Sequence, residues 1–280
     1  ERPGTALSRH AVDVILNPSA SHFAFGKTEI RRRFVLEGSR AFGVSYIYSN
    51  LLGNEAGRVI YDGDAMIASG GTVLATGSRF SFSDWQLTTA TIDVDLTRMN
   101  RAKMASFTPE VGDPSHGCVS AAMEFPRVQP QPTSAAPTSW EQGPHQKEEE
   151  FARAVRLGLL DYLRKSRSHG FVVSLSGGAD SAAVAVLVAS GIEAAAAQLG
   201  TEEFKSRFSW IKKLQEAPDT AAMVHALLTC VYQSTRNSSQ TTLDAARDVA
   251  KEVGAEFLQF DVDRQVEGYT QIVEQAIGRE

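Results

Sequence analysis

Residues 174–181, Ser-Leu-Ser-Gly-Gly-Ala-Asp-Ser, combine hydroxyls, glycines and a carboxylate directly after the apolar run 171–173. Two adjacent glycines let a backbone approach an anion closely, and the first turn of a following helix points unpaired N–H groups at that anion. Ser176 and Ser181 can donate hydrogen bonds to phosphate oxygens. The carboxylate of Asp180 repels bare phosphate but becomes favourable when a magnesium ion lies between them. The segment therefore predicts a site for a nucleotide with its metal ion.

The same residues also fit an ordinary strand-to-helix turn. In that interpretation Gly177 and Gly178 only close the turn, and Asp180 caps the helix. Short glycine motifs recur by chance, so composition alone leaves both interpretations open.

The elements expected around this segment alternate between helix and strand. Their ranges are helix 148–167, strand 171–175, helix 181–190, helix 241–253 and strand 256–260. One face of the first helix carries Phe151, Val155, Leu159 and Leu163, and Gly191 ends the second helix. The third helix has Thr241 and Asp244 in capping-box spacing at its start and Gly254 as its stop. This order predicts a parallel α/β sheet. In such a sheet, ligands bind at the loops that leave the carboxyl ends of the strands.

The first part of the chain is expected to be mixed, with sheet prominent. Its predicted elements are strand 12–17, helix 26–42, strand 44–48, a hairpin over 65–75 and a half-buried strand 89–96. The basic cluster 31–33 is interpreted as one solvated helix face. Half of the ten prolines fall between Pro126 and Pro144, which indicates an interdomain linker. We expect domains at 1–127 and 147–280, joined by a Pro-rich linker at 128–146.

Composition excludes several classes of protein. The chain has 280 residues, enough for two modest domains, and its net charge of -5 argues against a duplex nucleic-acid binder. No long uninterrupted apolar stretch indicates a membrane span. Two cysteines, Cys118 and Cys230, indicate neither a disulfide framework nor a cysteine-based zinc site, and we expect a reducing cytoplasm.

The string 176–181 resembles the Ser-Gly-Gly-x-Asp-Ser pyrophosphate loop of ATP-dependent amide-forming and adenylating enzymes. It lacks the Gly-Lys-Ser/Thr ending of the ordinary P-loop, so the resemblance implies adenylation with release of pyrophosphate. Two further segments narrow the family. Residues 17–27 resemble the segment just past the nucleophilic cysteine in the nitrilase-type glutaminase half of glutamine-dependent NAD synthetases, and residues 232–239 resemble the loop after the second strand of their synthetase half.

This resemblance implies a fold and an activity. The fold would be α/β, with a partial nitrilase-like αββα sandwich followed by a parallel synthetase domain of the adenine nucleotide alpha hydrolase type. The activity would be a ligase reaction of NAD biosynthesis, in which ATP adenylates the nicotinate carboxylate of deamido-NAD and ammonia from glutamine then displaces AMP. The implied cofactors are ATP and Mg2+, and the family implies a homo-oligomer in the cytoplasm, with small-molecule substrates and neither nucleic acid nor membrane as a partner.

The resemblance also assigns site residues. The ATP-binding residues would be Ser174, Leu175, Ser176, Gly177, Gly178, Ala179, Asp180, Ser181 and Asn237, with Asp180 as the magnesium ligand. Asn237 fits a helix-capping cluster equally well. Ser21 and Lys27 match positions that hold glutamine, while His22 is interpreted as structural or as a pocket wall.

The family's glutaminase residues, a Glu, a Lys and a Cys, lie upstream of residue 1, so no catalytic residue is assigned. Neither Cys118 nor Cys230 can replace the nucleophile. We therefore expect the 280 residues to be part of a longer polypeptide.

Two alternatives remain. One is another glutamine-dependent enzyme with a pyrophosphate loop, such as GMP synthetase or asparagine synthetase, although residues 17–27 speak against it. The other is an inactive nucleotide-binding fragment or scaffold protein.

Overall fold

The computed structural model describes residues 3–55, 57–104, 107–108, 119–124, 129 and 138–278. Residues 128 and 130–137 of the predicted linker, and Cys118, lie outside the described residues. The chain divides into two units, Glu1–Ala154 and Val155–Glu280. The division falls inside helix α4 (Gln146–Ser166).

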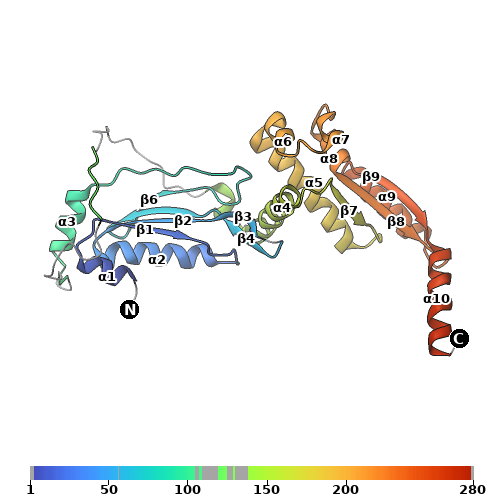
Figure 1. Cartoon of the computed structure of the whole chain (residues 1–280), viewed down its shortest axis with the longest axis horizontal. Coiled ribbons are helices and arrows are strands. Elements are labelled where there is room, and N and C mark those ends of the chain that lie inside the picture. The colour runs from blue at the N-terminus through green and yellow to red at the C-terminus, as the bar shows by residue number, and fades with distance from the viewer. Residues whose placement is uncertain are drawn as a thin grey trace. The chain divides into compact units, whose positions relative to one another are not determined.

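The first unit is built on a four-stranded sheet in the order β1-β2-β5-β6. Its elements are α1 (Pro3–Arg9), β1 (Val14–Ser19), α2 (Lys27–Phe42), β2 (Ser45–Asn50), β3 (Leu52–Glu55), β4 (Val59–Asp62), β5 (Ala65–Ser69), β6 (Thr72–Thr76), α3 (Val94–Ala102), the 3-10 helix Ser139–Gln142 and the start of α4. Strands β1 and β2 are parallel, β2-β5 and β5-β6 are antiparallel, and β3 and β4 form a separate pair. Helix α2 lies along the sheet (Figure 1).

The core between α2 and the sheet follows from the helical repeat of α2 and from the alternation of side chains along the strands. Val35 on α2 packs with Tyr48, Met66 and Ala68, which alternation along β2 and β5 places on one sheet face. Leu16 of β1 is 69% exposed, so an apolar residue lies uncovered at the sheet surface. Helix α2 and the β5-β6 hairpin confirm the elements expected from the pattern.

The predicted strand 89–96 is wrong. Residues 89–93 have no regular structure, and helix α3 begins at Val94. Asp93 caps this helix, because its side chain accepts a hydrogen bond from the backbone N–H of Leu96 at 2.9 Å. The alternating apolar residues fit a strand, but a carboxylate that satisfies a first-turn N–H favours the helix.

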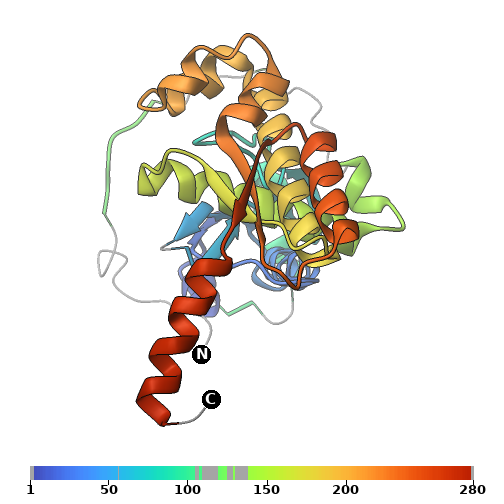
Figure 2. The ribbon, with the colours of Figure 1, turned by 90° about the vertical axis from the view of Figure 1, so that its right-hand side faces the viewer.

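The second unit contains the expected parallel sheet, in the order β7-β8-β9. Its elements are the rest of α4, β7 (Phe171–Ser174), α5 (Ala179–Leu199), α6 (Thr201–Arg207), α7 (Lys212–Gln215), α8 (Thr220–Leu227), β8 (Leu228–Ser234), α9 (Gln240–Glu252), β9 (Glu256–Asp261) and α10 (Asp263–Ile277). Figure 2 shows α5 and α9 side by side, while α10 extends away from the sheet with none of its residues buried.

Helix α5 does not end at Gly191 as predicted, but continues to Leu199. Gly191 is buried, and a Cβ there would lie 3.3 Å from the Arg156 Cγ of α4. The glycine therefore allows two helices to approach, and the helix ends at Gly200, which has a φ of +83°.

Length and composition alone would let α5 cross a membrane, and it is the one such helix among the described residues. Seven of its residues are buried inside the second unit, including Val188 and Ile192. It packs against α6, α8 and β7. An apolar helix in the core of a water-soluble fold has the same composition.

The face of α4 that packs in the core also differs from the predicted face. Its buried apolar residues are Ala154, Leu157, Leu160 and Leu163, whereas Phe151 is 51% exposed. The apolar positions of this helix cover more than one face, so spacing alone did not select the face that packs.

Candidate functional site

The segment 174–181 forms the exit of β7 and the entry of α5. Ser174 is the last residue of β7, and the N–H of Leu175 still donates to the carbonyl of Val231 on β8 at 2.8 Å. The side chain of Leu175 is buried in the core, so a ligand can meet only its backbone. Ala179 begins α5. The intervening turn leaves the carboxyl end of a parallel strand, where such sheets bind ligands.

The two serines of the turn lie close to each other. Their hydroxyls are 3.2 Å apart, and the Oγ of Ser181 also accepts from the backbone N–H of Ser176 at 3.2 Å. The N–H of Gly178 donates to the Oγ of Ser176 at 3.3 Å. Ser176, Gly178 and Ser181 thus form a ring of small polar groups at the start of a 21-residue helix. Hydroxyls of this kind can rotate toward phosphate oxygens, and the first N–H groups of a helix have no intrahelical acceptor and can donate to an anion.

The turn is accessible to solvent. Ser176, Gly178, Ala179 and Asp180 are exposed, and Asp180 lies in the first turn of α5. A carboxylate at this place offers a hard oxygen ligand beside the anion-binding turn, which suits magnesium. Among the described residues no group of three or more His, Cys, Asp or Glu is arranged to hold a metal.

A second loop leaves the next strand at the same edge. β7 and β8 are parallel neighbours, so residues 235–238 follow β8 on the side of the sheet where the first turn lies. Asn237 is exposed in this loop, and its N–H donates to Thr235 Oγ1 at 3.3 Å. The cap of α9 is Ser239, which accepts from Thr242 N–H, so the predicted cap at Thr241 is wrong. Asn237 is not a helix cap and remains a candidate for nucleotide contact.

Ser21 and Lys27, the predicted glutamine-binding residues, lie on the loop from β1 to α2 and at the start of α2. The ammonium group of Lys27 donates to the carbonyl of His22 at 2.9 Å. Asn50 holds Ser21 from the end of β2: Ser21 N–H donates to Asn50 Oδ1 at 2.8 Å, and Asn50 Nδ2 donates to the Ser21 carbonyl at 2.9 Å. The structure thus brings both residues to the carboxyl end of two parallel strands.

Arg31 corrects the interpretation of the basic cluster. It is 5% exposed, whereas its neighbour Arg32 is half-buried and Arg33 is exposed. Successive helix residues are about 100° apart, so three in a row cannot share one face. Its guanidinium donates to Asp62 Oδ2 at 2.6 Å and to the carbonyl of Ser21 at 2.7 Å.

A buried ion network surrounds this arginine. Asp62 also accepts from Asn50 at 2.8 Å and lies 3.6 Å from Arg79, and Arg79 in turn pairs with Glu150 at 2.9 Å. Burial by itself would lower the pKa of Arg31, but the adjacent Asp62 outweighs burial and the pKa is raised. None of these residues was predicted from the sequence. The sequence feature that could have indicated these residues is the pair of carboxylates, Asp62 and Asp64, on either side of Gly63 between two apolar strands.

The stability of the first unit is expected to depend on pH through Asp64. Burial, reinforced by Asp62 and opposed by Arg79 and Arg31, raises the pKa of Asp64 from 3.8 to about 6. The folded state then holds a proton that the unfolded state releases, so the free energy of unfolding should fall as pH rises from about 4 to about 6. Two pKa units correspond to about 3 kcal/mol. Urea unfolding of a chain with Trp85 and Trp210 replaced by Phe, so that Trp140 alone reports, measures this.

The Asp64→Asn variant should lose most of the decline between pH 4 and 6. A matched variant at an exposed carboxylate, Glu29→Gln, should keep it. Equal slopes in all three chains would contradict a raised pKa at Asp64.

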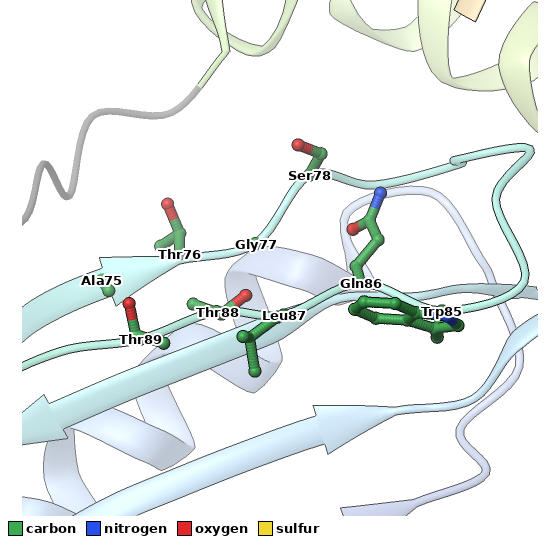
Figure 3. Close-up of a pocket in the computed structure, with 9 residues that line it drawn as sticks. All are labelled: Ala75, Thr76, Gly77, Ser78, Trp85, Gln86, Leu87, Thr88 and Thr89. Atoms are coloured by element: carbon green, nitrogen blue, oxygen red, sulfur yellow. The ribbon is translucent and has the colours of Figure 1, made fainter. Parts of the chain in front are cut away.

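Two other features do not form a reactive site. Burial raises the pKa of the Cys230 thiol, which is fully buried in β8, so this cysteine is a poor nucleophile. A cavity of about 470 Å3 lies between the end of β6 and residues 85–89 (Figure 3). Its lining holds threonines, a serine and the exposed Trp85 and Leu87, and includes neither a charged group nor any predicted site residue.

Comparison with known proteins shows what this chain is similar to. Residues 151–279 match the family model described as NAD synthase. A glutamine-dependent NAD(+) synthetase of Oryza sativa subsp. indica is 32% identical over 289 residues, which cover 99% of this chain and 38% of that protein. The chain is homologous to the glutamine-dependent NAD(+) synthetases. The resemblance expected from residues 17–27, 176–181 and 232–239 is thereby confirmed.

Solved structures of glutamine-dependent NAD(+) synthetases agree with this relationship. That of the Cytophaga hutchinsonii protein is 35% identical, with a TM-score of 0.70 over 97% of this chain and 40% of that chain. The Acinetobacter baumannii protein, solved in complex with ADP, shares the fold at 17% identity, with a TM-score of 0.59, over 98% of this chain and 39% of that chain. The predicted α/β fold is confirmed. The chain spans about two fifths of the length of the synthetases it matches.

Proposed function

We propose that this chain carries the ATP-binding turn of a glutamine-dependent NAD(+) synthetase, together with part of its glutamine-handling domain. The observation that carries the proposal is the exposed turn 176–178 between β7 and α5, with two paired hydroxyls and a helix N-terminus behind it. In this proposal Ser174 to Ser181 contact ATP, and Asn237 adds a contact from the neighbouring loop. The solved complex of the Acinetobacter baumannii synthetase with ADP supports nucleotide binding in this fold.

The proposed reaction uses ATP to activate a carboxylate. The nicotinate carboxylate of deamido-NAD attacks the α-phosphorus, the bond to pyrophosphate breaks, and an acyl adenylate forms. Ammonia then attacks the acyl carbon, AMP leaves with the bonding pair, and the amide of NAD(+) remains. The protein's share is to orient the phosphates and to offset their charge, which is what N–H groups, hydroxyls and a helix dipole do.

Asp180 is the proposed magnesium ligand, and Mg2+ would supply positive charge between its carboxylate and the phosphates. Ser21 and Lys27 are the proposed glutamine contacts, since an ammonium group suits an amino-acid carboxylate. A homo-oligomer and a cytoplasmic location are part of the same proposal, as the family relationship suggests both.

Isothermal titration of the 280-residue chain with ATP tests the nucleotide site. We expect binding with magnesium and weaker binding with EDTA. Asp180→Asn should reduce the dependence on magnesium, because the ion loses its charged protein ligand and keeps the phosphates, while Asp244→Asn on α9 should leave it unchanged. Absence of ATP binding in both conditions would favour the alternative of an inactive fragment or scaffold protein.

A further inference from the structure

Helix α9 is in close contact with the turn 176–178 between β7 and α5. A Cβ at Gly177 would lie 2.5 Å from the backbone oxygen of Thr242 and 2.9 Å from its Cα. Gly177 also has a φ of +80°, in the left-handed region that favours glycine. The turn therefore takes its shape while in contact with the first turn of α9, 65 residues further along the chain.

The hydroxyl of Thr242 has three hydrogen-bond contacts, two with Ser239 and one with Tyr232. Its hydroxyl donates to the carbonyl of Ser239 at 2.9 Å, which uses its one proton. The hydroxyl of Tyr232 lies 2.7 Å from the same oxygen, and Tyr232 is the donor in that contact when Thr242 donates to Ser239. Tyr232 belongs to β8 and is 4% exposed. The core of the second unit thus holds the first turn of α9 at a set distance from the sheet.

We propose that Thr242 and Tyr232 are positioning residues for ATP binding, which rests on the function proposed above. Neither is in the turn itself. Their hydrogen bond fixes α9, and α9 limits the positions open to Gly177. A turn that binds phosphate through backbone N–H groups binds more tightly when its shape is set beforehand, because less ordering is needed on binding. Without the hydrogen bond, α9 can shift and the turn samples other shapes.

Isothermal titration with ATP and magnesium tests this in the 280-residue chain. Thr242→Val keeps the shape of the side chain but removes the hydroxyl, and Tyr232→Phe removes the donor. Each variant should raise the Kd for ATP about tenfold, in line with the loss of one hydrogen bond. The double variant should be little weaker than either single one, because both changes break the same contact. Thr242→Ser should bind almost normally.

Thr241→Val is the matched control. Thr241 is the exposed neighbour on the same helical turn, and the same chemical change there should leave the Kd unchanged. Equal affinities of the Thr242→Val and Thr241→Val variants would overturn the proposal.

Hydrogen exchange of the ATP-free chain separates this proposal from the proposed function. The peptide that covers residues 175–178 should exchange faster in Thr242→Val and Tyr232→Phe than in the parent and in Thr241→Val. If the parent bound no ATP, the proposed function would fail, yet this comparison would still decide the positioning role. Unchanged exchange in both variants would overturn that role, whatever the affinity for ATP.

Discussion

Replacing Gly177 with alanine is expected to reduce ATP affinity by at least about 100-fold, which corresponds to about 2.8 kcal/mol. The φ of +80° already strains any other residue by about 1–3 kcal/mol. The added Cβ would also lie 2.5 Å from a backbone oxygen of α9, and a backbone atom cannot turn aside as a side chain can. The turn must therefore move, and its N–H groups move with it. Isothermal titration with ATP and magnesium measures the loss.

Two other glycines serve as controls for this variant. At Gly178 a Cβ would lie 3.3 Å from Ser176 Oγ, the end of a short side chain, and φ is −97°, so Gly178→Ala should have a smaller effect. At Gly268 of α10 nothing lies within 4 Å, and Gly268→Ala should bind ATP as the parent does. If Gly177→Ala bound ATP like Gly268→Ala, the turn would not be the phosphate site.

Replacing Asp62 with alanine is expected to destabilise the first unit by about 3–5 kcal/mol. Asp62 is fully buried, and its removal leaves Arg31 without the carboxylate at 2.6 Å and Asn50 Nδ2 with the Ser21 carbonyl as its remaining acceptor. A buried guanidinium that loses its nearest counter-ion keeps its desolvation cost with less compensating attraction, since among the described residues only Asp64 remains, at 3.5 Å. Urea unfolding followed by the fluorescence of Trp140 as the single tryptophan reports on this unit.

The control is an ion pair on the same helix. Arg33 and Glu29 pair at 3.1 Å with both side chains largely exposed, and such pairs contribute about 0–1 kcal/mol. Glu29→Ala should therefore change the free energy of unfolding by less than about 1 kcal/mol. A similar effect of Asp62→Ala and Glu29→Ala would contradict the structural role given to the buried network.

Several elements could be predicted because their cause lies within a few residues. Helix α2 and the hairpin β5-β6 follow from apolar spacing and from glycines at their ends, and the parallel sheet follows from the order of helices and strands. The turn 176–178 was found in the same way, since two glycines and two hydroxyls after an apolar strand are a local pattern.

Other predictions were wrong because the structure at those positions depends on a residue that is distant in the sequence. Gly191 stops a helix by local rules, yet in the fold it accommodates Arg156, 35 residues earlier. Arg31 looks like one of three surface charges, yet Asp62, 31 residues later, holds it in the interior. A single sequence gives the type and spacing of these residues but not the partner that each will meet.

The sequence by itself predicted a turn suited to anion binding after strand β7, because glycine flexibility and helix-end N–H groups are properties of neighbouring residues, although β7 is only partly buried, with Val172 76% exposed. Only the tertiary structure decided what holds that turn and what surrounds Ser21. The partners are Thr242 with Tyr232 in one unit and Arg31 with Asp62 and Asn50 in the other. These contacts depend on how helices pack on sheets, since packing sets which distant groups come within hydrogen-bonding distance.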